Sequence, residues 1–267
     1  MARSIASSVA PAVEQFELDG DVVVTVDRLA HVLRHAGKAD APRDVAYELQ
    51  RAGWLGSLRT RDAWEFLPAA RGGAFGSGDR FIEFRAQLAN NTAWPGLLAM
   101  ESAASVLGLA QRAPEREVVA LPHGIVPPKA LAGDWRVVTL ALPEDGVTTV
   151  DGLPTWNLEG LLVGIATRPS AYQDIPGLGQ WLADATYQAD VEMIMCLLEP
   201  ASAAARQRAA YLFVAGDNVQ AAEQIAQTFP ARGVAWFGPR RRGGEFDQLT
   251  QVNDTALYPY LEVGTGS

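Results

Sequence analysis

Two histidines stand at a spacing that could bind a metal ion. His31 and His35 are four residues apart within a run whose apolar residues recur at helical spacing, and two histidines one helical turn apart can share a zinc ion. In zinc proteases with this motif a glutamate directly follows the first histidine, whereas this sequence has Val32 there. We therefore expect two solvated histidines on a polar helix face and no metal site.

Other residues that could do chemistry lack the patterns that enzymes need. The sequence has no nucleophile elbow, no P-loop and no dinucleotide fingerprint in a strand–helix context. The stretch RGGAFGSGDR, residues 71–80, lacks the Lys-Ser/Thr ending of a phosphate loop and is typical of a linker. Asp184, Asp190 and Glu192 are close in sequence, but carboxylates on solvent faces of helices need no catalytic explanation. The sequence therefore predicts no enzymatic activity, no catalytic residue and no cofactor.

The single cysteine, Cys196, lies in the apolar run VEMIMCLLEP. One cysteine can form neither an intramolecular disulfide nor a cysteine metal cluster. We expect a buried, unreactive thiol in a reducing cytoplasm.

Arginines gather instead around a predicted hairpin. Residues 53–68, GWLGSLRTRDAWEFLP, contain two short extended segments that turn near residues 60–62. Two helical patterns precede the hairpin, over residues 26–37 and 42–52. Two helices followed by a hairpin is the element order of a winged helix-turn-helix.

Capping residues support both helices. Thr25 precedes the first helix, and Asp40 precedes the second, where Pro42 suits the first turn. Gly37 and Gly53 follow the two helix ends, where a left-handed backbone conformation is common.

In a winged helix-turn-helix the second helix enters the major groove of DNA, and the hairpin reaches phosphates or the minor groove. Acidic neighbours on the helix, Asp44 and Glu48, reduce its positive charge. Winged helices also serve as protein adaptors, so a protein-binding role is the alternative. The residues predicted to contact DNA are Arg43, Tyr47 and Arg51 on the helix, with Arg59 and Arg61 at the hairpin tip.

Composition and charge limit the classes of function. A chain of 267 residues with 48% hydrophobic residues is long enough for two soluble domains. No apolar run approaches the ~20 residues that cross a bilayer, and the N-terminal residues lack the apolar region of a signal peptide. We therefore expect a cytoplasmic protein.

The net charge of −9 is unfavourable for DNA binding but unevenly distributed. Residues 1–80 carry ten basic and eleven acidic side chains, a net charge of −1, and the remainder has a net charge of −8. A first domain that is nearly neutral can present a basic face, whereas the acidic remainder suits a basic protein partner.

Four segments together carry a resemblance to a known family: the hairpin segment above, SAASVLGL leading into EVVALP, LEGLLVGIATRPSAYQDIPGLGQWL, and VNDTALYPYL. With these motifs the sequence resembles the AbiEi-type antitoxins, the transcriptional regulators of type IV toxin–antitoxin systems. The resemblance implies that the first domain binds operator DNA upstream of its own operon, and that the second counters a cognate nucleotidyltransferase-like toxin.

Three adjacent arginines, Arg240, Arg241 and Arg242, lie between glycines in GPRRRGG. A fully solvated loop is one interpretation. The other is a contact with phosphate or with the toxin, because neighbouring guanidinium groups repel each other without an anionic partner.

Together these observations predict an α+β protein. We expect a winged helix-turn-helix over residues 1–72, a Gly-rich linker over 73–80 and, over 81–267, an α+β antitoxin domain with a helical C-terminal half. The expected partners are operator DNA and the toxin, with no membrane. Two alternatives stay open: a protein-interaction module without an operator, and an antitoxin that modifies its toxin by phosphoryl transfer, which needs a nucleotide site.

Overall fold

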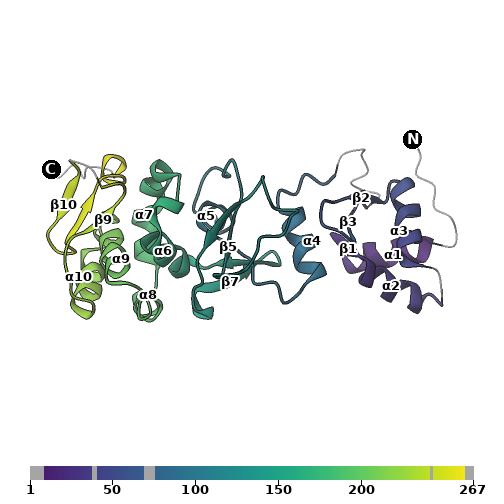
Figure 1. Cartoon of the computed structure of the whole chain (residues 1–267), viewed down its shortest axis with the longest axis horizontal. Coiled ribbons are helices and arrows are strands. Elements are labelled where there is room, and N and C mark those ends of the chain that lie inside the picture. The colour runs from purple at the N-terminus through teal and green to yellow at the C-terminus, as the bar shows by residue number, and fades with distance from the viewer. Residues whose placement is uncertain (1–8, 38–40, 69–75, 241–242, 262–267) are drawn as a thin grey trace. The chain divides into compact units, whose positions relative to one another are not determined.

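The computed structural model describes residues 9–37, 41–68, 76–240 and 243–261 (Figure 1). The chain divides into two compact units. Unit 1 comprises Met1–Trp94 and Val126–Ala132, and unit 2 comprises Pro95–Ile125 and Gly133–Ser267. Within the part of the chain that is described, no helix has the length and apolar character to cross a membrane.

Unit 1 contains the two helices followed by a hairpin that the sequence predicts. Its three strands form one antiparallel sheet in the order β1-β3-β2, so β2 and β3 make the predicted hairpin. The elements are α1 (Ala10–Asp19), β1 (Val23–Thr25), α2 (Val26–His35), α3 (Pro42–Arg51), β2 (Leu55–Ser57), β3 (Ala63–Phe66) and α4 (Ile82–Asn90).

Local interactions fix the ends of the two predicted helices. The Thr25 hydroxyl accepts a hydrogen bond from the backbone N–H of Arg28 at 3.1 Å, which confirms the cap of α2. Helix α3 begins with Pro42 in its first turn and Ala41 as its N-cap residue, and the predicted cap Asp40 lies outside the described residues. Gly53 follows α3 with a φ of 81°, a conformation that favours glycine.

Helix α4 extends unit 1 beyond the predicted winged helix. It packs against β1 and β3, and its buried Phe84 meets the Trp94 ring edge-on, with centroids 5.2 Å apart. The compact unit therefore runs to Trp94 and includes residues 81–94, which the sequence assigns to the second domain. Helix α4 belongs to unit 1 because of its tertiary packing, and a local sequence pattern does not predict such packing.

Unit 2 combines two sheets with a series of helices. The first sheet has the order β6-β5-β4-β8-β7 and the second has the order β10-β11-β9. The strands are β4 (Leu97–Leu98), β5 (Val118–Leu121), β6 (Arg136–Thr139), β7 (Val147–Val150), β8 (Leu153–Trp156), β9 (Ala235–Phe237), β10 (Glu245–Asp247) and β11 (Val252–Asp254). The helices are α5 (Met100–Val106), α6 (Leu158–Thr167), α7 (Ile175–Gln188), α8 (Val191–Leu198), α9 (Ala203–Ala215) and α10 (Val219–Thr228), with short 3₁₀ turns at Glu144–Gly146, Pro169–Ala171 and Tyr258–Tyr260.

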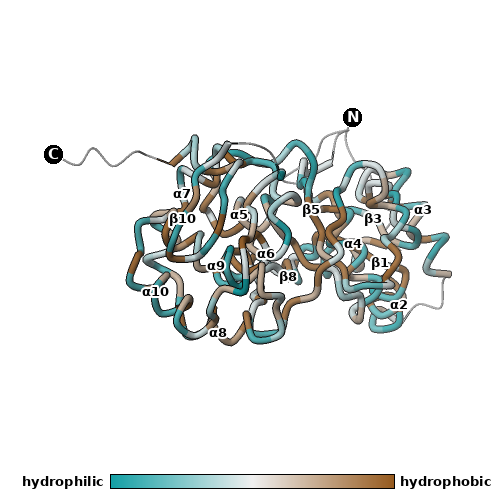
Figure 2. The backbone as a smooth tube through the Cα atoms, turned by 60° about the vertical axis from the view of Figure 1, so that its left-hand side comes forward, coloured by the Kyte–Doolittle hydropathy of each residue, from teal (hydrophilic) through white to brown (hydrophobic). Residues whose placement is uncertain are grey.

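Helix α6 lies at the centre of the unit 2 core. It contacts α5, α8 and α9, and its residues from Gly160 to Ala166 are all buried. The Asn157 side chain caps it by accepting a hydrogen bond from the N–H of Gly160 at 2.7 Å. The fold is thus mixed α and β with a helical second half, as predicted. Hydropathy follows burial: β5 is hydrophobic, whereas α3 is largely hydrophilic (Figure 2).

Cys196 corrects one prediction. The thiol lies on α8 but is exposed rather than buried. Its neighbours Leu197 and Leu198 are buried. A helix turns by about 100° per residue, so consecutive side chains point in different directions and can differ in exposure. An uninterrupted apolar run conceals which residues of a helix face outward.

Candidate nucleic-acid interface

Helix α3 buries one face and exposes the other. Val45, Ala46 and Leu49 are buried in the core of unit 1. The three residues predicted to contact DNA from this helix, Arg43, Tyr47 and Arg51, are exposed. The Tyr47 side chain is 55% exposed while its ring meets Trp64 of β3 edge-on, at 6.2 Å between centroids. One solvent face therefore carries all three.

Arg43 is tied to the hairpin. Its Nε and Nη2 groups donate hydrogen bonds to Oδ1 and Oδ2 of Asp62, at 3.1 and 3.0 Å. These hydrogen bonds and the charge of Asp62 raise the pKa of Arg43 above its usual value. Asp62 sits in the hairpin turn with a φ of 60°. Sequence reasoning missed this pair, because it forms only when the hairpin folds back toward the start of α3.

The hairpin tip, residues 58–62, carries Arg59 and Arg61, and both side chains are exposed. Glu83 of α4 accepts hydrogen bonds from the backbone N–H groups of Arg59 and Thr60, at 2.6 and 3.0 Å. It accepts a third from the Thr60 hydroxyl at 2.8 Å. Asn90 of α4 donates to the carbonyl oxygen of Arg61 at 2.6 Å. The tip is therefore held by side chains from outside the hairpin.

The charges of the four predicted arginines are not equally available. Arg43 is paired with Asp62, and the Arg59 Nε lies 3.8 Å from a carboxylate oxygen of Glu83. Arg51 and Arg61 have no ion-pair partner among the residues that the structure describes. These two therefore offer the most available positive charge for phosphate contacts.

The two histidines of the predicted solvated face are exposed on α2. The centroids of their rings lie 4.2 Å apart, and His35 Nδ1 is 2.9 Å from the carbonyl oxygen of His31. They border a cavity of about 320 Å³ together with Asp19 and Arg28. Hydrogen bonds from Gln15 and Arg28 lower the pKa of Asp19. Within the described ranges, no three His, Cys, Asp or Glu side chains are grouped so as to hold a metal ion.

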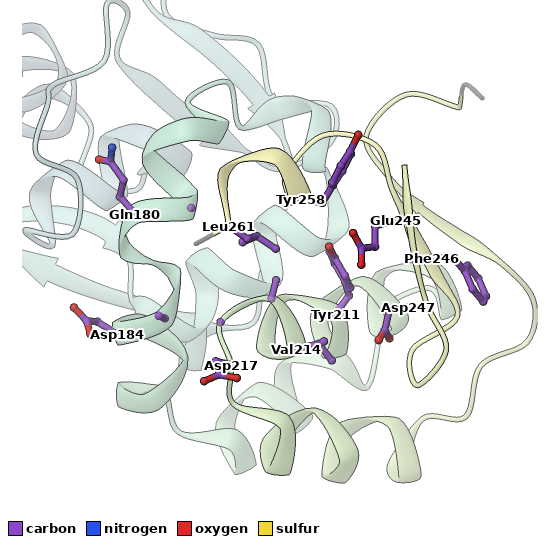
Figure 3. Close-up of a pocket in the computed structure, with 14 residues that line it drawn as sticks. Gln180, Asp184, Tyr211, Val214, Asp217, Glu245, Phe246, Asp247, Tyr258 and Leu261 are labelled. Carbon is purple, nitrogen blue, oxygen red and sulfur yellow. The ribbon is translucent and has the colours of Figure 1, made fainter. Parts of the chain in front are cut away.

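Unit 2 contains a cavity of about 770 Å³ with an acidic lining. Asp184 comes from α7, Asp217 from the turn after α9, and Glu245 and Asp247 from β10 (Figure 3). No lysine, arginine or histidine belongs to this lining as the described residues form it. The negative charge of these carboxylates is unfavourable for binding the phosphates of a nucleotide, which are also negatively charged.

Tyr211 and Asp254 form a buried pair beside this cavity. The Tyr211 hydroxyl donates to Oδ2 of Asp254 at 2.6 Å. Burial, followed by the charge of Asp254, raises the pKa of the phenol. Asp254 also accepts hydrogen bonds from the N–H groups of Ala256, Leu257 and Tyr258. The aspartate of the VNDTALYPYL motif thus organises the chain end around it.

The triple-arginine loop is only partly described. Arg240 is exposed, and Arg241 and Arg242 lie outside the described residues. Its role as a phosphate or toxin contact stays a prediction.

Comparison with known proteins confirms the family resemblance for the larger part of unit 2. Residues 96–214 match the family model of the AbiEi antitoxin C-terminal domain. The chain is also similar to the RV2827C protein from Mycobacterium tuberculosis, whose crystal structure it matches with a TM-score of 0.80 at 27% sequence identity. That match covers 97% of this chain and 95% of the other. A comparison with curated proteins finds no match.

Proposed function

We propose that this chain, whose residues 96–214 carry an AbiEi antitoxin C-terminal domain, is a DNA-binding antitoxin that represses its own type IV toxin–antitoxin operon. The family match supports the antitoxin role. In the proposal, unit 1 binds operator DNA and unit 2 counteracts a cognate nucleotidyltransferase-like toxin. The chain acts without catalysing a reaction.

One observation supports DNA binding most directly. Helix α3 presents Arg43, Tyr47 and Arg51 to solvent, and the hairpin tip next to it presents Arg59 and Arg61. A helix of this kind fits the major groove, where arginine reads base edges, while the hairpin meets the phosphates beside it. The two acidic side chains Asp44 and Glu48 lower the affinity but do not cover the helix.

A gel-shift titration tests the DNA-binding half of the proposal. The full-length protein should bind the DNA upstream of its own gene more tightly than random DNA of equal length. The double variant Arg51→Ala, Arg61→Ala should weaken both complexes, because it removes the two most available cations of the interface. Equal affinity for the upstream and the random duplex would remove the operator from the proposal.

A co-expression experiment tests the antitoxin half. The open reading frame next to this gene should encode a nucleotidyltransferase-like protein that arrests growth alone and is tolerated with this chain. Replacing Arg240, Arg241 and Arg242 by alanine should leave the fold intact, because a polar loop contributes little to a core. If that loop contacts phosphate or the toxin, the variant should lose operator affinity or rescue.

A second candidate is a protein-interaction module without an operator. The pairing of Arg43 with Asp62 favours it, because that pair neutralises one of the four arginine charges expected to meet DNA. The gel shift separates the two functions. Phosphoryl transfer to the toxin is a third and weaker candidate, and it requires that the purified protein bind ATP and raise the mass of the toxin.

A further inference from the structure

Glu83 of α4 attaches the first part of the hairpin tip, Arg59 and Thr60, through its carboxylate. Both oxygens of Glu83 are used, and the three donors come from the consecutive residues Arg59 and Thr60. The Glu83 side chain is only 12% exposed. Hydrogen bonds to a charged acceptor that is shielded from water are stronger than those between neutral, exposed groups.

The same helix holds the other half of the tip. Asn90 lies seven residues after Glu83, which places it two turns further along the same face of α4. Its hydrogen bond to the carbonyl oxygen of Arg61 continues the attachment by one residue. Phe84 is fully buried and packs against Trp94, and α4 packs against β1 and β3. The tip is therefore fixed to a rigid element.

The far end of the tip is attached to α3. Asp62, the last residue of the tip, receives both hydrogen bonds from Arg43. Residues 59 to 62 are thus each held from outside the hairpin, by α4 on one side and by α3 on the other. A short surface loop without such bonds samples many conformations. Here its position relative to α3 is set before any ligand binds.

We infer that Glu83 and Asn90 are positioning residues of the DNA-binding unit. They fix the hairpin tip so that Arg59 and Arg61 meet phosphates while α3 lies in the groove. This inference rests on the proposed DNA binding. A tip that is already ordered loses less conformational entropy on binding, which raises affinity without any new contact. Helix α4 then belongs to the functional DNA-binding unit, although it follows the winged helix in sequence.

The charge and the hydrogen bonds of Glu83 have opposite effects. The carboxylate orders the tip through its hydrogen bonds. It also lies 3.8 Å from the Arg59 Nε, so its negative charge lowers the positive electrostatic potential that attracts a phosphate. Glu83→Gln removes the charge and keeps one acceptor oxygen, so it can retain the two hydrogen bonds from Thr60 but not the one from the Arg59 N–H. Glu83→Ala removes the charge and all three hydrogen bonds. Because both variants lack the charge, the difference between them reports the positioning effect of the hydrogen bonds from Thr60.

The test uses four full-length variants: Glu83→Ala, Glu83→Gln, Asn90→Ala and, as a control on the same helix, Gln87→Ala. Amide hydrogen exchange at Arg59 and Thr60 reports the attachment in the absence of DNA. Operator affinity at several salt concentrations reports the function. Thermal melts first establish that each variant is folded.

We expect Glu83→Ala to accelerate exchange at Thr60 and to weaken operator binding about tenfold, as for the loss of a preordered contact loop. The slope of log K against log salt should also fall, by about one unit for each phosphate contact that the tip no longer makes. Partial unfolding alone would lower the amount of active protein and leave that slope unchanged. Glu83→Gln should lose less affinity than Glu83→Ala, because it can retain the hydrogen bonds from Thr60. Asn90→Ala should also show a smaller loss, and Gln87→Ala should match the wild type.

Three outcomes overturn the inference. Unchanged Thr60 exchange in Glu83→Ala would mean that the carboxylate does not hold the tip. Faster exchange with unchanged affinity and salt slope would mean that the position of the tip does not matter, while DNA binding itself stands. If the wild type binds no operator, the proposed function fails and the positioning role fails with it, whereas the exchange data still report the attachment.

Discussion

At the scale of single residues, Asp62 controls how much charge α3 can offer. It accepts hydrogen bonds from Nε and Nη2 of Arg43 and sits at a φ of 60°, where asparagine is tolerated as well as aspartate. Asp62→Asn should therefore keep the turn, weaken its hold on Arg43 and remove a negative charge. We expect tighter binding to random DNA, measured by titration at low and moderate salt.

Asp44→Asn is the matched control for this variant. It removes one exposed carboxylate from the same interface without releasing an arginine, so it should also tighten non-specific binding, but less. If Asp62→Asn gains no more affinity than Asp44→Asn, the ion pair does not restrain Arg43.

The two arginines of the tip should differ in their salt dependence. Arg61 has no ion-pair partner among the described residues, so Arg61→Ala should lower the slope of log K against log salt by about one unit. Arg59→Ala should lower it less, because Glu83 already compensates part of the Arg59 charge. Arg112→Ala, an exposed arginine of unit 2, serves as the control. Unchanged slopes for both tip variants would show that the hairpin does not contact DNA.

At the scale of elements, the sequence predicts what local chemistry determines. Apolar spacing and the Thr25 cap predicted α2, and the glycine after α3 predicted where the hairpin begins. The Arg43–Asp62 pair and the attachment of the tip to Glu83 join residues 19 and 24 positions apart, counted from Arg43 and Arg59. Such contacts depend on how elements pack, and periodicity carries no information about them.

Helix α6 offers a stability test of this packing. A Cβ added at Gly164 would clash with the ring of Trp156, which is itself fully buried. Gly164→Ala should therefore destabilise the protein by about 1–3 kcal/mol through overpacking, measured by urea unfolding. The helix preference of alanine over glycine opposes this loss by less than about 1 kcal/mol.

Trp156→Phe provides the internal control for Gly164→Ala, because the smaller ring leaves space near the new methyl group. The double variant should lose less stability than the two single losses combined. Strict additivity would mean that the alanine methyl group does not meet the Trp156 ring.

At the scale of the whole molecule, buried phenols set an upper pH limit for stability. Burial raises the pKa of Tyr172, whose hydroxyl accepts a hydrogen bond from Trp181 at 3.3 Å. An unfolded chain ionises its tyrosines near pH ~10, so above that pH the unfolded state releases a proton that the folded state retains. The stabilisation from neutral Tyr172 is therefore complete below about pH 10 and is lost as the pH rises further.

Comparison of the wild type with Tyr172→Phe measures this contribution. The free energy of unfolding of the wild type should fall relative to that of the variant between about pH 10 and 11.5. A difference that stays constant over this range would mean that Tyr172 ionises equally in both states.

The two compact units each have their own hydrophobic core, one around Phe16, Leu29 and Trp64 and the other around Trp156, Leu161 and Phe213. A surface substitution in unit 1 should therefore leave the core of unit 2 intact. In the full-length chain, Arg59→Ala combined with Arg61→Ala should weaken repression of a reporter placed behind the operator. With toxin and antitoxin expressed from unrelated promoters, the same variant should still rescue growth, because unit 2 counteracts the toxin in the proposed function. Loss of rescue at unchanged protein levels would show instead that neutralisation acts through DNA, and that the antitoxin needs both units together.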